Sequence, residues 1–519
     1  MSPETGSATD DFTLAGMLRK LAASRPQAPA VSMDGRTLDF ATVHARSSQV
    51  AQALRRSGVR SGDRIAILDK NAPTFYDVVF GAAKLGAVTI GLNFRLAPPE
   101  LAAILRDAAP KVVVVAPEFR PLLPDDLGGT RVVHLGPDFE SWLGGESSDD
   151  PAVDVDPESV ALQLYSSGTT GRPKGAMLTN ANLSWTVRMG HEKYGMDADS
   201  VNLVPSPLFH IGGAGYSLTT MGQGGHTVLI RDAAPGALLG LIARHRVTHM
   251  FAVPAVIQMM VEHPDLPETD LTSLTRIAYG AAPMGETHLL QAIEAFGCGF
   301  MGVYGMTEAA GTVVCLDPAD HDPGGPRAHL LRSVGRPLPW LEMRLVDPLS
   351  GDDSLVGKVG EIWIRSGQNM AGYWHNPELT AEALVGGGWL RTGDAAYRDA
   401  EGYVYMHDRL KDMIVSGGEN VYPAEVENAM SGHPDIRDLA VIGVPSERWG
   451  ETVKALVVLR AGSTPDQAAL ISWTRERLAH YKCPTSIDFV EVLPRNASGK
   501  ILKHQLRGPY WAGYERAVH

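Results

Sequence analysis

Short apolar segments of strand length alternate with helix-like segments through the first third of the chain. This pattern predicts helices over residues 40–58, 73–86 and 98–109 and strands over 63–68, 87–92 and 111–116. A similar alternation recurs over residues 238–278. Strands that alternate with helices pair in parallel and are covered on both faces, so the pattern predicts an α/β fold. Residues 120–157 lack periodicity and are rich in Pro, Gly and Asp, so we expect surface loops there.

The composition restricts the kind of protein further. The chain has 519 residues, more than one hydrophobic core accommodates, so we expect more than one domain. The net charge of −13 argues against nucleic-acid binding and polybasic membrane anchoring. Three cysteines are too few for a disulfide framework, and the apolar runs are too short to span a bilayer. We therefore expect a soluble cytoplasmic protein that binds no nucleic acid and has no stable membrane insertion.

The pattern changes beyond about residue 411. A helix over residues 423–430, strands over 440–444 and 453–459, and an amphipathic helix over 468–480 predict a separate small α+β unit. Between residues 473 and 507, seven basic residues stand against three acidic ones. We therefore expect this end of the chain to approach an anion.

The segment YSSGTTGRPKG at residues 165–175 has the composition of a polyphosphate-binding loop. Its glycines let successive N–H groups face one concavity, and its hydroxyls and one lysine add donors. We expect a strand before this loop and a helix from about residue 180 after it. The segment is not a Walker A motif, which would have Gly and Lys at the positions of Pro173 and Lys174. An ordinary P-loop NTPase is therefore disfavoured.

Six motifs in order over about 335 residues closely resemble those of the adenylate-forming superfamily, which includes acyl-CoA synthetases, firefly luciferases and peptide-synthetase adenylation domains. The motifs are the loop at 165–175, PLFH at 207–210, YGMTE at 304–308, RTGD at 391–394, DRLKD at 408–412 and PRNASGK at 494–500. The segment IVSGGENVYP at 414–423 looks most like bacterial fatty-acyl-CoA ligases. The resemblance implies a large AMP- and acid-binding domain over residues 1–408, built from parallel or mixed sheets flanked by helices. It also implies a small mobile α+β domain over residues 409–519.

The resemblance further implies roles for individual residues. Catalysis is implied for Lys500, Glu308, Thr307 and His210, with Glu308 as the Mg²⁺ ligand and Lys411 as the hinge. Nucleotide or CoA binding is implied for Ser166, Ser167, Gly168, Thr169, Thr170, Gly171, Lys174, Tyr304, Gly305, Asp394, Arg409, Gly417, Gly418 and Trp449. The chemistry of several residues agrees with these roles. A carboxylate suits Mg²⁺, an ionised Asp394 accepts from both ribose hydroxyls, and the Lys500 ammonium offsets repulsion between two anions.

The implied reaction is that of an ATP-dependent acyl-CoA synthetase. A carboxylic acid and ATP give acyl-AMP and pyrophosphate, and coenzyme A then gives acyl-CoA and AMP. His210 stands where amino-acid-activating relatives carry Asp, and Gly305 stands where acetate-type relatives carry Trp. Small residues at Gly280, Ala281, Gly302 and Gly305 leave volume for the acid, so with His210 they form the expected acid pocket. We expect a medium- or long-chain fatty acid or another bulky apolar acid.

Three alternatives stay open at this point. The first is an aryl-acid CoA ligase of the coumarate or benzoate type, and the second is a luciferase-like oxygenase that uses the same adenylate. The third is a non-catalytic acyl-adenylate or lipid binder, against which the joint presence of Lys500, Glu308, Thr307 and Asp394 argues. The expected partners are the acid, ATP and CoA, and the oligomeric state is left open between monomer and homodimer.

Overall fold

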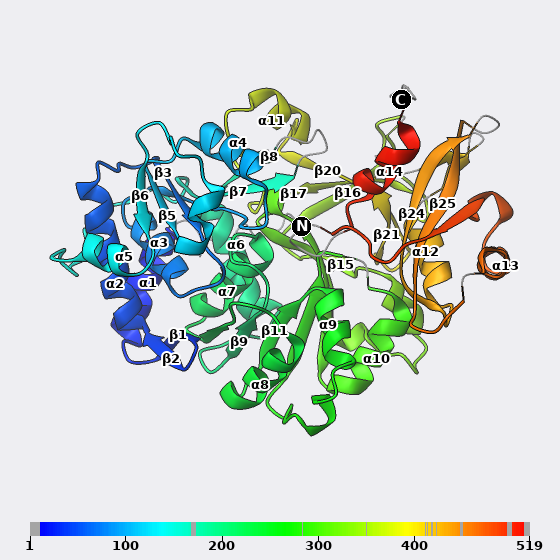
Figure 1. Ribbon diagram of the computed structural model, residues 1–519, viewed down its shortest axis with the longest axis horizontal. Coiled ribbons are helices and arrows are strands. Elements are labelled where there is room, and N and C mark those ends of the chain that lie inside the picture. The colour runs from blue at the N-terminus through cyan, green and yellow to red at the C-terminus, as the bar shows by residue number, and fades with distance from the viewer. Residues whose placement is uncertain are drawn as a thin grey trace.

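The computed structural model contains four β-sheets with helices packed around them (Figure 1). It describes residues 11–167, 173–282, 284–348, 350–409, 412, 414–416, 419–421, 423–446, 450–464, 466–495 and 501–512. Three sheets and their helices form the large part of the molecule, and the fourth sheet forms a smaller unit at one end (Figure 1). The predicted α/β fold with a large and a small domain is therefore confirmed.

The first sheet has seven strands, with parallel strands at its centre and an antiparallel hairpin toward one edge. In spatial order these are β18 (Gly372–Tyr373), β8 (Pro173–Thr179), β7 (Val160–Ser167), β4 (Val88–Gly91), β3 (Arg64–Leu68), β5 (Val112–Val115) and β6 (Arg131–His134). Its helices are α1 (Leu14–Ser24), α2 (Phe40–Arg56), α3 (Thr74–Ala83), α4 (Pro98–Ala108) and α5 (Pro137–Leu143). The helices and strands predicted between residues 40 and 116 are all present. Strand β5 consists of four fully buried valines, as expected of a central parallel strand.

The second sheet has nine strands and mixed pairing. In spatial order these are β15 (Arg336–Pro337), β14 (Gly311–Leu316), β13 (Gly299–Met306), β12 (Arg276–Gly280), β11 (His249–Ala252), β9 (Val201–Val204), β10 (His226–Leu229), β1 (Pro29–Met33) and β2 (Arg36–Asp39). Its helices are α6 (Asn180–Glu192), α7 (Ile211–Gly222), α8 (Pro235–His245), α9 (Pro254–Val261) and α10 (Glu286–Phe296). Helices α6 and α7 pack on each other and lie between the first two sheets (Figure 1).

The third sheet is antiparallel and leads to the C-terminal unit. It contains β16 (Glu342–Val346), β17 (Gly360–Arg365), β20 (Trp389–Arg398), β19 (Leu384–Val385) and β21 (Val404–Arg409), with α11 (Pro377–Ala383) beside it. The C-terminal unit contains β23 (Glu419–Val421), β22 (Ile414–Ser416), β25 (Gly450–Leu459), β24 (Ile436–Ser446), β26 (Ser486–Phe489), α12 (Pro423–Ser431), α13 (Gln467–Arg475) and α14 (Lys503–Trp511). Helix α12 of this unit packs against β21. The exact boundary of the two domains, and the mobility of the second, stay predictions.

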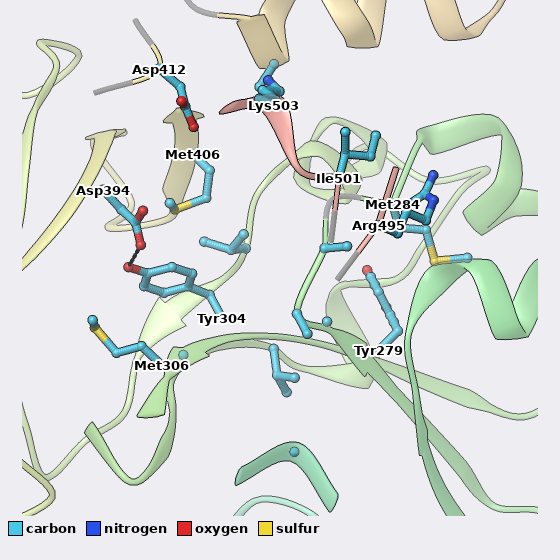
Figure 2. Close-up of a pocket in the computed structure, with 18 of the residues that line it drawn as sticks. Tyr279, Met284, Tyr304, Met306, Asp394, Met406, Asp412, Arg495, Ile501 and Lys503 are labelled. Carbon is cyan, nitrogen blue, oxygen red and sulfur yellow. Dashed lines mark hydrogen bonds between the residues drawn. The ribbon is translucent and has the colours of Figure 1, made fainter. Parts of the chain in front are cut away.

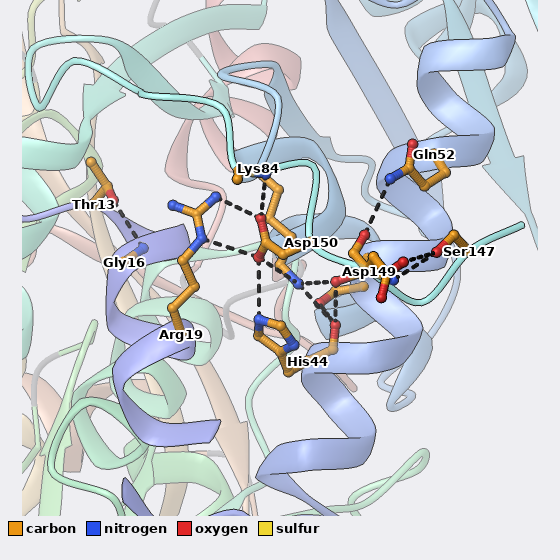
Figure 3. Close-up of polar contacts among 12 residues, drawn as sticks. Thr13, Gly16, Arg19, His44, Gln52, Lys84, Ser147, Asp149 and Asp150 are labelled. Atoms are coloured by element: carbon orange, nitrogen blue, oxygen red, sulfur yellow. Dashed lines mark hydrogen bonds and ion pairs between the residues drawn. The ribbon is translucent and has the colours of Figure 1, made fainter. Parts of the chain in front are cut away.

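The prediction that residues 120–157 are surface loops was wrong in part. This segment contains β6 and α5, and α5 buries Phe139, Trp142 and Leu143 against the core. The helix is only one short element of seven residues, too short to leave a periodic signal in the sequence. At the end of the segment, the Asp150 carboxylate accepts hydrogen bonds from Arg19 of α1 and lies beside Lys84 (Figure 3).

The phosphate loop also differs from its predicted setting. Strand β7 precedes it as expected and α6 begins at Asn180, but strand β8 intervenes and pairs antiparallel with β7. The described residues on either side of the loop are therefore paired strands, and the element that follows it is a strand and not a helix. Sequence periodicity missed β8 because Pro173, Lys174 and Gly175 at its start are poor strand formers.

The charge count of the C-terminal segment gives a misleading picture of its surface. Several of the basic residues counted there form ion pairs with carboxylates of neighbouring elements: Lys482 with Glu425, Arg495 with Asp438, Lys503 with Glu427, and Arg507 with Asp412. All four acidic partners lie before residue 473, outside the segment 473–507 in which the charges were counted. The excess of positive charge is therefore largely compensated within the fold. Within the described ranges, no helix combines the length and the apolar character needed to cross a bilayer.

Candidate active site

A single cavity of about 2530 Å³ lies between the large part of the molecule and the C-terminal unit. Figure 2 shows Tyr304 and Asp394 on the left of the view, with Asp412 and Lys503 of the C-terminal unit above them. The predicted residues on its wall are Lys174, His210, Gly280, Ala281, Gly302, Tyr304, Gly305, Thr307, Glu308 and Asp394. Residues more than 200 positions apart in sequence thus meet in one space.

Other predicted residues fall outside what the structure describes. Ser166 and Ser167 end strand β7, and Arg409 ends β21, but their side chains are not described. Outside the described residues altogether are Gly168, Thr169, Thr170, Gly171, Lys411, Gly417, Gly418, Trp449 and Lys500. Their roles stay predictions.

Tyr304 and Asp394 form one polar corner of the cavity. The Tyr304 hydroxyl donates a 2.8 Å hydrogen bond to Oδ2 of Asp394, which joins the end of β13 to β20 (Figure 2). Asp394 is 8% exposed, so its carboxylate faces the cavity from an otherwise buried position. A flat ring can stack on a nucleobase, and the carboxylate beside it can accept hydrogen bonds from ribose hydroxyls. Together they can hold a nucleoside.

Glu361 holds this corner in place, and sequence reasoning missed it. Its Oε2 accepts from the Arg391 guanidinium at 3.0 and 3.1 Å and from the Trp363 indole at 2.9 Å. Its Oε1 accepts from the backbone N–H of Gly393 at 3.1 Å. The side chain is almost fully buried, so these partners are what make an ionised carboxylate tolerable there. Glu361 thereby fixes the turn that presents Asp394.

Glu308 follows the same end of β13, in the short 3₁₀ turn Thr307–Ala309. Thr307 and Glu308 are both only 8% exposed and line the cavity. The Tyr373 hydroxyl of β18 donates a 2.9 Å hydrogen bond to Oε1 of Glu308, and Lys174 Nζ lies 5.4 Å from the Tyr373 ring centroid. Burial, with the Glu308 charge as a second cause, raises the pKa of Tyr373 above its usual value, so its hydroxyl remains a donor. A single carboxylate of this kind suits Mg²⁺, which keeps several waters and takes further oxygens from substrate phosphates.

His210 caps the N-terminus of α7. Its Nδ1 accepts a 3.0 Å hydrogen bond from the Gly212 backbone N–H, which places the ring proton of the neutral form on Nε2. Burial lowers the pKa of His210 to about 4. At neutral pH this residue is therefore an uncharged donor on the cavity wall, as expected of a pocket residue and not of a cation.

The small residues predicted to line the acid pocket have a structural reason besides the volume they leave. A Cβ atom on Gly305 would lie 2.0 Å from the Gly311 carbonyl oxygen of the paired strand β14, and one on Gly280 would lie 2.2 Å from the Val303 carbonyl oxygen. Both positions therefore exclude any side chain while the backbones stay where they are. Gly302 is less constrained, with the Tyr279 hydroxyl at 3.0 Å from a Cβ.

Comparisons with known proteins give the family. The chain matches the family model described as AMP-binding enzyme over residues 18–374 and the AMP-binding enzyme C-terminal domain over residues 425–500. The chain belongs to the AMP-binding enzyme family. The predicted membership of the adenylate-forming superfamily is confirmed, and the protein is a ligase of that superfamily.

The relatives of this ligase differ in what they act on. A fatty acid–[acyl-carrier-protein] ligase of Streptomyces coeruleorubidus is 38% identical over 95% of this chain and 96% of its own length. A feruloyl-CoA synthase of an Amycolatopsis species is 41% identical over 93% of this chain and 96% of its own. A solved anthranilate-CoA ligase in complex with anthranoyl-AMP superimposes with a TM-score of 0.90 at 28% identity, covering 98% of this chain and 99% of that one. These comparisons support acyl- or aryl-CoA ligase activity and do not single out fatty acids.

Proposed function

We propose that this ligase converts a bulky apolar carboxylic acid, ATP and coenzyme A to an acyl-CoA in two steps. The observation that carries the proposal is the shared cavity of the Tyr304–Asp394 pair, Glu308 and the apolar pocket beyond His210. That cavity has a nucleoside corner, a carboxylate for a hard cation and a hydrophobic recess within one space. The acid's carboxylate and the α-phosphate can thus be brought together.

In the first step the acid's carboxylate oxygen attacks the α-phosphorus and pyrophosphate leaves. Asp394 and Tyr304 orient the nucleoside, while Thr307 and Lys174 bind phosphate oxygens. Lys500 approaches the two reacting anions and offsets the charge that builds between them. Mg²⁺ held by Glu308 would neutralise phosphate charge when bound.

In the second step the thiol of coenzyme A attacks the acyl carbon of the adenylate and AMP leaves. The small domain, residues 409–519, rotates about Lys411 between the steps, so that Lys500 withdraws. Gly417, Gly418 and Trp449 then line the channel for the pantetheine arm. Because the two glycines have no side chains, the arm can pass close to the backbone there.

The acid is medium- or long-chain aliphatic or ring-bearing. Names of relatives favour both classes: a fatty acid in one case and ferulate, indoleacetate and 2-succinylbenzoate in others. The neutral His210 and the surrounding aromatic side chains Tyr216 and Phe251 suit an uncharged body on the acid in either class.

An acid panel with and without coenzyme A tests the proposal. Pyrophosphate release and thioester formation are measured for alkanoates of several lengths, benzoates and cinnamates. We expect pyrophosphate release that depends on one class of acid, and thioester formation that requires coenzyme A. Glu308→Gln should lose both activities, whereas Glu342→Gln, on the exposed edge strand β16, should keep them. Activation of the acid with transfer to a carrier protein or an amine, and none to coenzyme A, would overturn the proposed acceptor.

A further inference from the structure

Three consecutive residues after β3 tie the first sheet to the second. The Asp69 carboxylate accepts a 2.9 Å hydrogen bond from Arg231, just beyond β10. Lys70 Nζ lies 2.6 Å from the carboxylate of Asp232. Asn71 comes next and is only 5% exposed. The loop between β3 and α3 is therefore docked on the second sheet at the carboxyl ends of parallel strands, where open α/β sheets bind their ligands.

The side chain of Asn71 bonds the backbone of the segment that leads to His210. Its Oδ1 accepts from the Leu208 N–H at 2.9 Å. Its Nδ2 donates to the carbonyl oxygens of Ser206 at 3.0 Å and of Val204 at 3.4 Å. Both ends of the amide are thus used on a segment 133 to 137 positions away in sequence.

This segment has no regular backbone pairing of its own. Residues 205–210 lie between β9 and α7 and belong to no helix or strand. Pro205 and Pro207 supply no N–H, so the segment has few donors with which to order itself. Buried backbone groups need hydrogen-bond partners, and the amide of Asn71 provides them here. The position of the segment therefore depends on Asn71.

The wall of the cavity continues directly from this segment. Phe209 and His210 follow Leu208 in sequence, and both line the cavity. The segment also lies close against β4, since a Cβ atom on Gly91 would be 2.7 Å from Cα of Phe209. A displacement of the backbone at Leu208 would move both wall residues with it. Asn71, which does not itself line the cavity, thus controls a wall that does.

We propose that Asn71 is a positioning residue for the acid, which holds Phe209 and His210 where they receive the body of the acid and does not touch the acid itself. The proposal rests on the proposed function and adds to it a residue outside the cavity. The nucleoside corner at Tyr304 and Asp394 belongs to other elements, β13 and β20. A displaced wall therefore weakens acid binding and leaves ATP binding in place.

The test compares Asn71→Ala with a matched variant, Asn180→Ala, in the full-length enzyme. Asn180 is 2% exposed, and its amide also joins two backbones away from the cavity. Its Oδ1 accepts from the Leu14 N–H at 3.0 Å, and its Nδ2 donates to the Ser159 carbonyl oxygen at 3.1 Å. The measured quantities are kcat/KM for the acid, over the acid panel, and the KM for ATP, both in pyrophosphate release.

We expect Asn71→Ala to lower kcat/KM for the preferred acid about tenfold and to change the KM for ATP by less than about twofold, since a small misplacement of a binding wall affects the ligand that touches it. Asn180→Ala should leave both quantities unchanged. Asn71→Asp keeps the size of the side chain and the acceptor for Leu208 but loses the donor to Ser206. It should act in the same direction, and it replaces Asn71→Ala if that variant does not fold.

Hydrogen exchange followed by mass spectrometry locates the change in the molecule. Asn71→Ala should speed exchange in peptides that contain residues 206–212, because the Leu208 N–H loses its acceptor. Asn180→Ala should instead speed exchange near residue 14.

The outcomes separate this proposal from the proposed function. The assignment of Asn71 is overturned, while the ligase function stands, by equal changes in the KM for the acid and for ATP or by an equal loss of acid activation in Asn180→Ala. Unchanged exchange over residues 206–212 in Asn71→Ala would also overturn it. If no acid of the panel supports pyrophosphate release by the wild-type enzyme, both proposals fail.

Discussion

The Tyr373 hydroxyl donates a 2.9 Å hydrogen bond to the Glu308 carboxylate across 65 positions of sequence. Tyr373 lies on β18 at the edge of the first sheet, whereas Glu308 follows β13 of the second. The bond therefore joins two sheets at the carboxylate that we assign to Mg²⁺, and Tyr373 acts as a positioning residue for it.

Removing this hydroxyl should weaken the metal requirement of the first step. Tyr373→Phe keeps the ring but loses a hydrogen bond to a charged group, worth about 1.5–3 kcal/mol. We expect the Mg²⁺ concentration for half-maximal pyrophosphate release to rise about tenfold, with a smaller change in the KM for the acid. Tyr481→Phe, at an exposed tyrosine of the C-terminal unit, serves as the control. A lower rate at every Mg²⁺ concentration, with no shift in its midpoint, would assign Tyr373 a purely structural role.

Glu361 offers a second test of positioning. Glu361→Gln preserves the shape of the side chain but removes the charge that faces Arg391, and it cannot accept from all of its present donors. We expect the KM for ATP to rise about tenfold and the free energy of unfolding to fall by about 1–3 kcal/mol. The matched control is Glu342→Gln, because Glu342 pairs with Arg365 on exposed strands and such pairs contribute little. An unchanged KM for ATP would show that the Asp394 turn holds its shape unaided.

Tyr373 and Glu361 mark the limit of what the sequence could predict. Tyr304, Glu308 and Asp394 could be placed in one site because each sits in a motif of recognisable order. Tyr373 lies next to a turn and belongs to none of the six motifs. A signal for Glu361 was present, since a lone carboxylate interrupts the apolar strand 360–365. Its partners Arg391 and Gly393 lie 30 and 32 positions away, however, and only the pairing of β17 with β20 brings them to Glu361.

In the fold, too, local sequence patterns could be predicted and tertiary pairing could not. Strands and helices with strong local periodicity, such as β5 and α2, were predicted closely. Strand β8 was missed because it exists through pairing with β7, a tertiary interaction that outweighs the poor strand propensity of its first residues.

Lys500 provides a test of the two-step mechanism. Lys500→Ala should abolish acid-dependent exchange between ATP and pyrophosphate, because it removes the ammonium that approaches both reacting anions and offsets their repulsion. Transfer to coenzyme A from a supplied acyl-adenylate should persist, since the proposed rotation removes Lys500 from that step. The two half-reactions are measured separately, with the exposed Lys358→Ala as control. Equal loss of both half-reactions would contradict the two-conformation mechanism.

Stability should fall as the pH falls from 7.5 to 5.5. Burial lowers the pKa of His210, His226, His249 and His321 to about 4 each. The unfolded chain, with histidine pKa values near 6.5, therefore binds more protons between pH 4 and 6.5, and protonation favours unfolding in that window. Each histidine should remove roughly 1 kcal/mol from the free energy of unfolding by pH 5.5.

Two buried carboxyl groups, Asp69 and Asp77, oppose this trend, because burial raises the pKa of each. Burial raises the pKa of Asp77 to about 6, and the neighbouring Arg46 opposes this rise only in part. Asp77 therefore takes up a proton in the folded state and partly offsets the histidines below that pH. Urea titrations at pH 7.5 and pH 5.5 measure the net change in the free energy of unfolding. His249→Gln should make the dependence shallower, whereas His134→Gln, at a partly exposed ring paired with Asp138, should not. A free energy of unfolding that is equal at the two pH values would show that these histidines are accessible to protons in the folded state.

The charge cluster around Asp150 should be the most sensitive polar point of the N-terminal helices (Figure 3). The Asp150 carboxylate accepts from Arg19 at 2.8 and 3.0 Å and lies 3.4 Å from the Nζ atom of Lys84, which is fully buried. Burial lowers the pKa of Lys84 to about 8, and Asp150→Asn would remove the charge that sustains its ammonium. We expect a loss of about 3 kcal/mol in the free energy of unfolding at pH 7, because a buried cation would lose its counter-charge. Asp149→Asn changes the adjacent exposed carboxylate, which accepts from Ser147, and should cost no more than about 0.5 kcal/mol. Lys84 loses its proton more readily without Asp150, so the loss in the free energy of unfolding caused by Asp150→Asn should be smaller at pH 9. A loss that stays constant from pH 7 to 9 would contradict the role given to this ion pair.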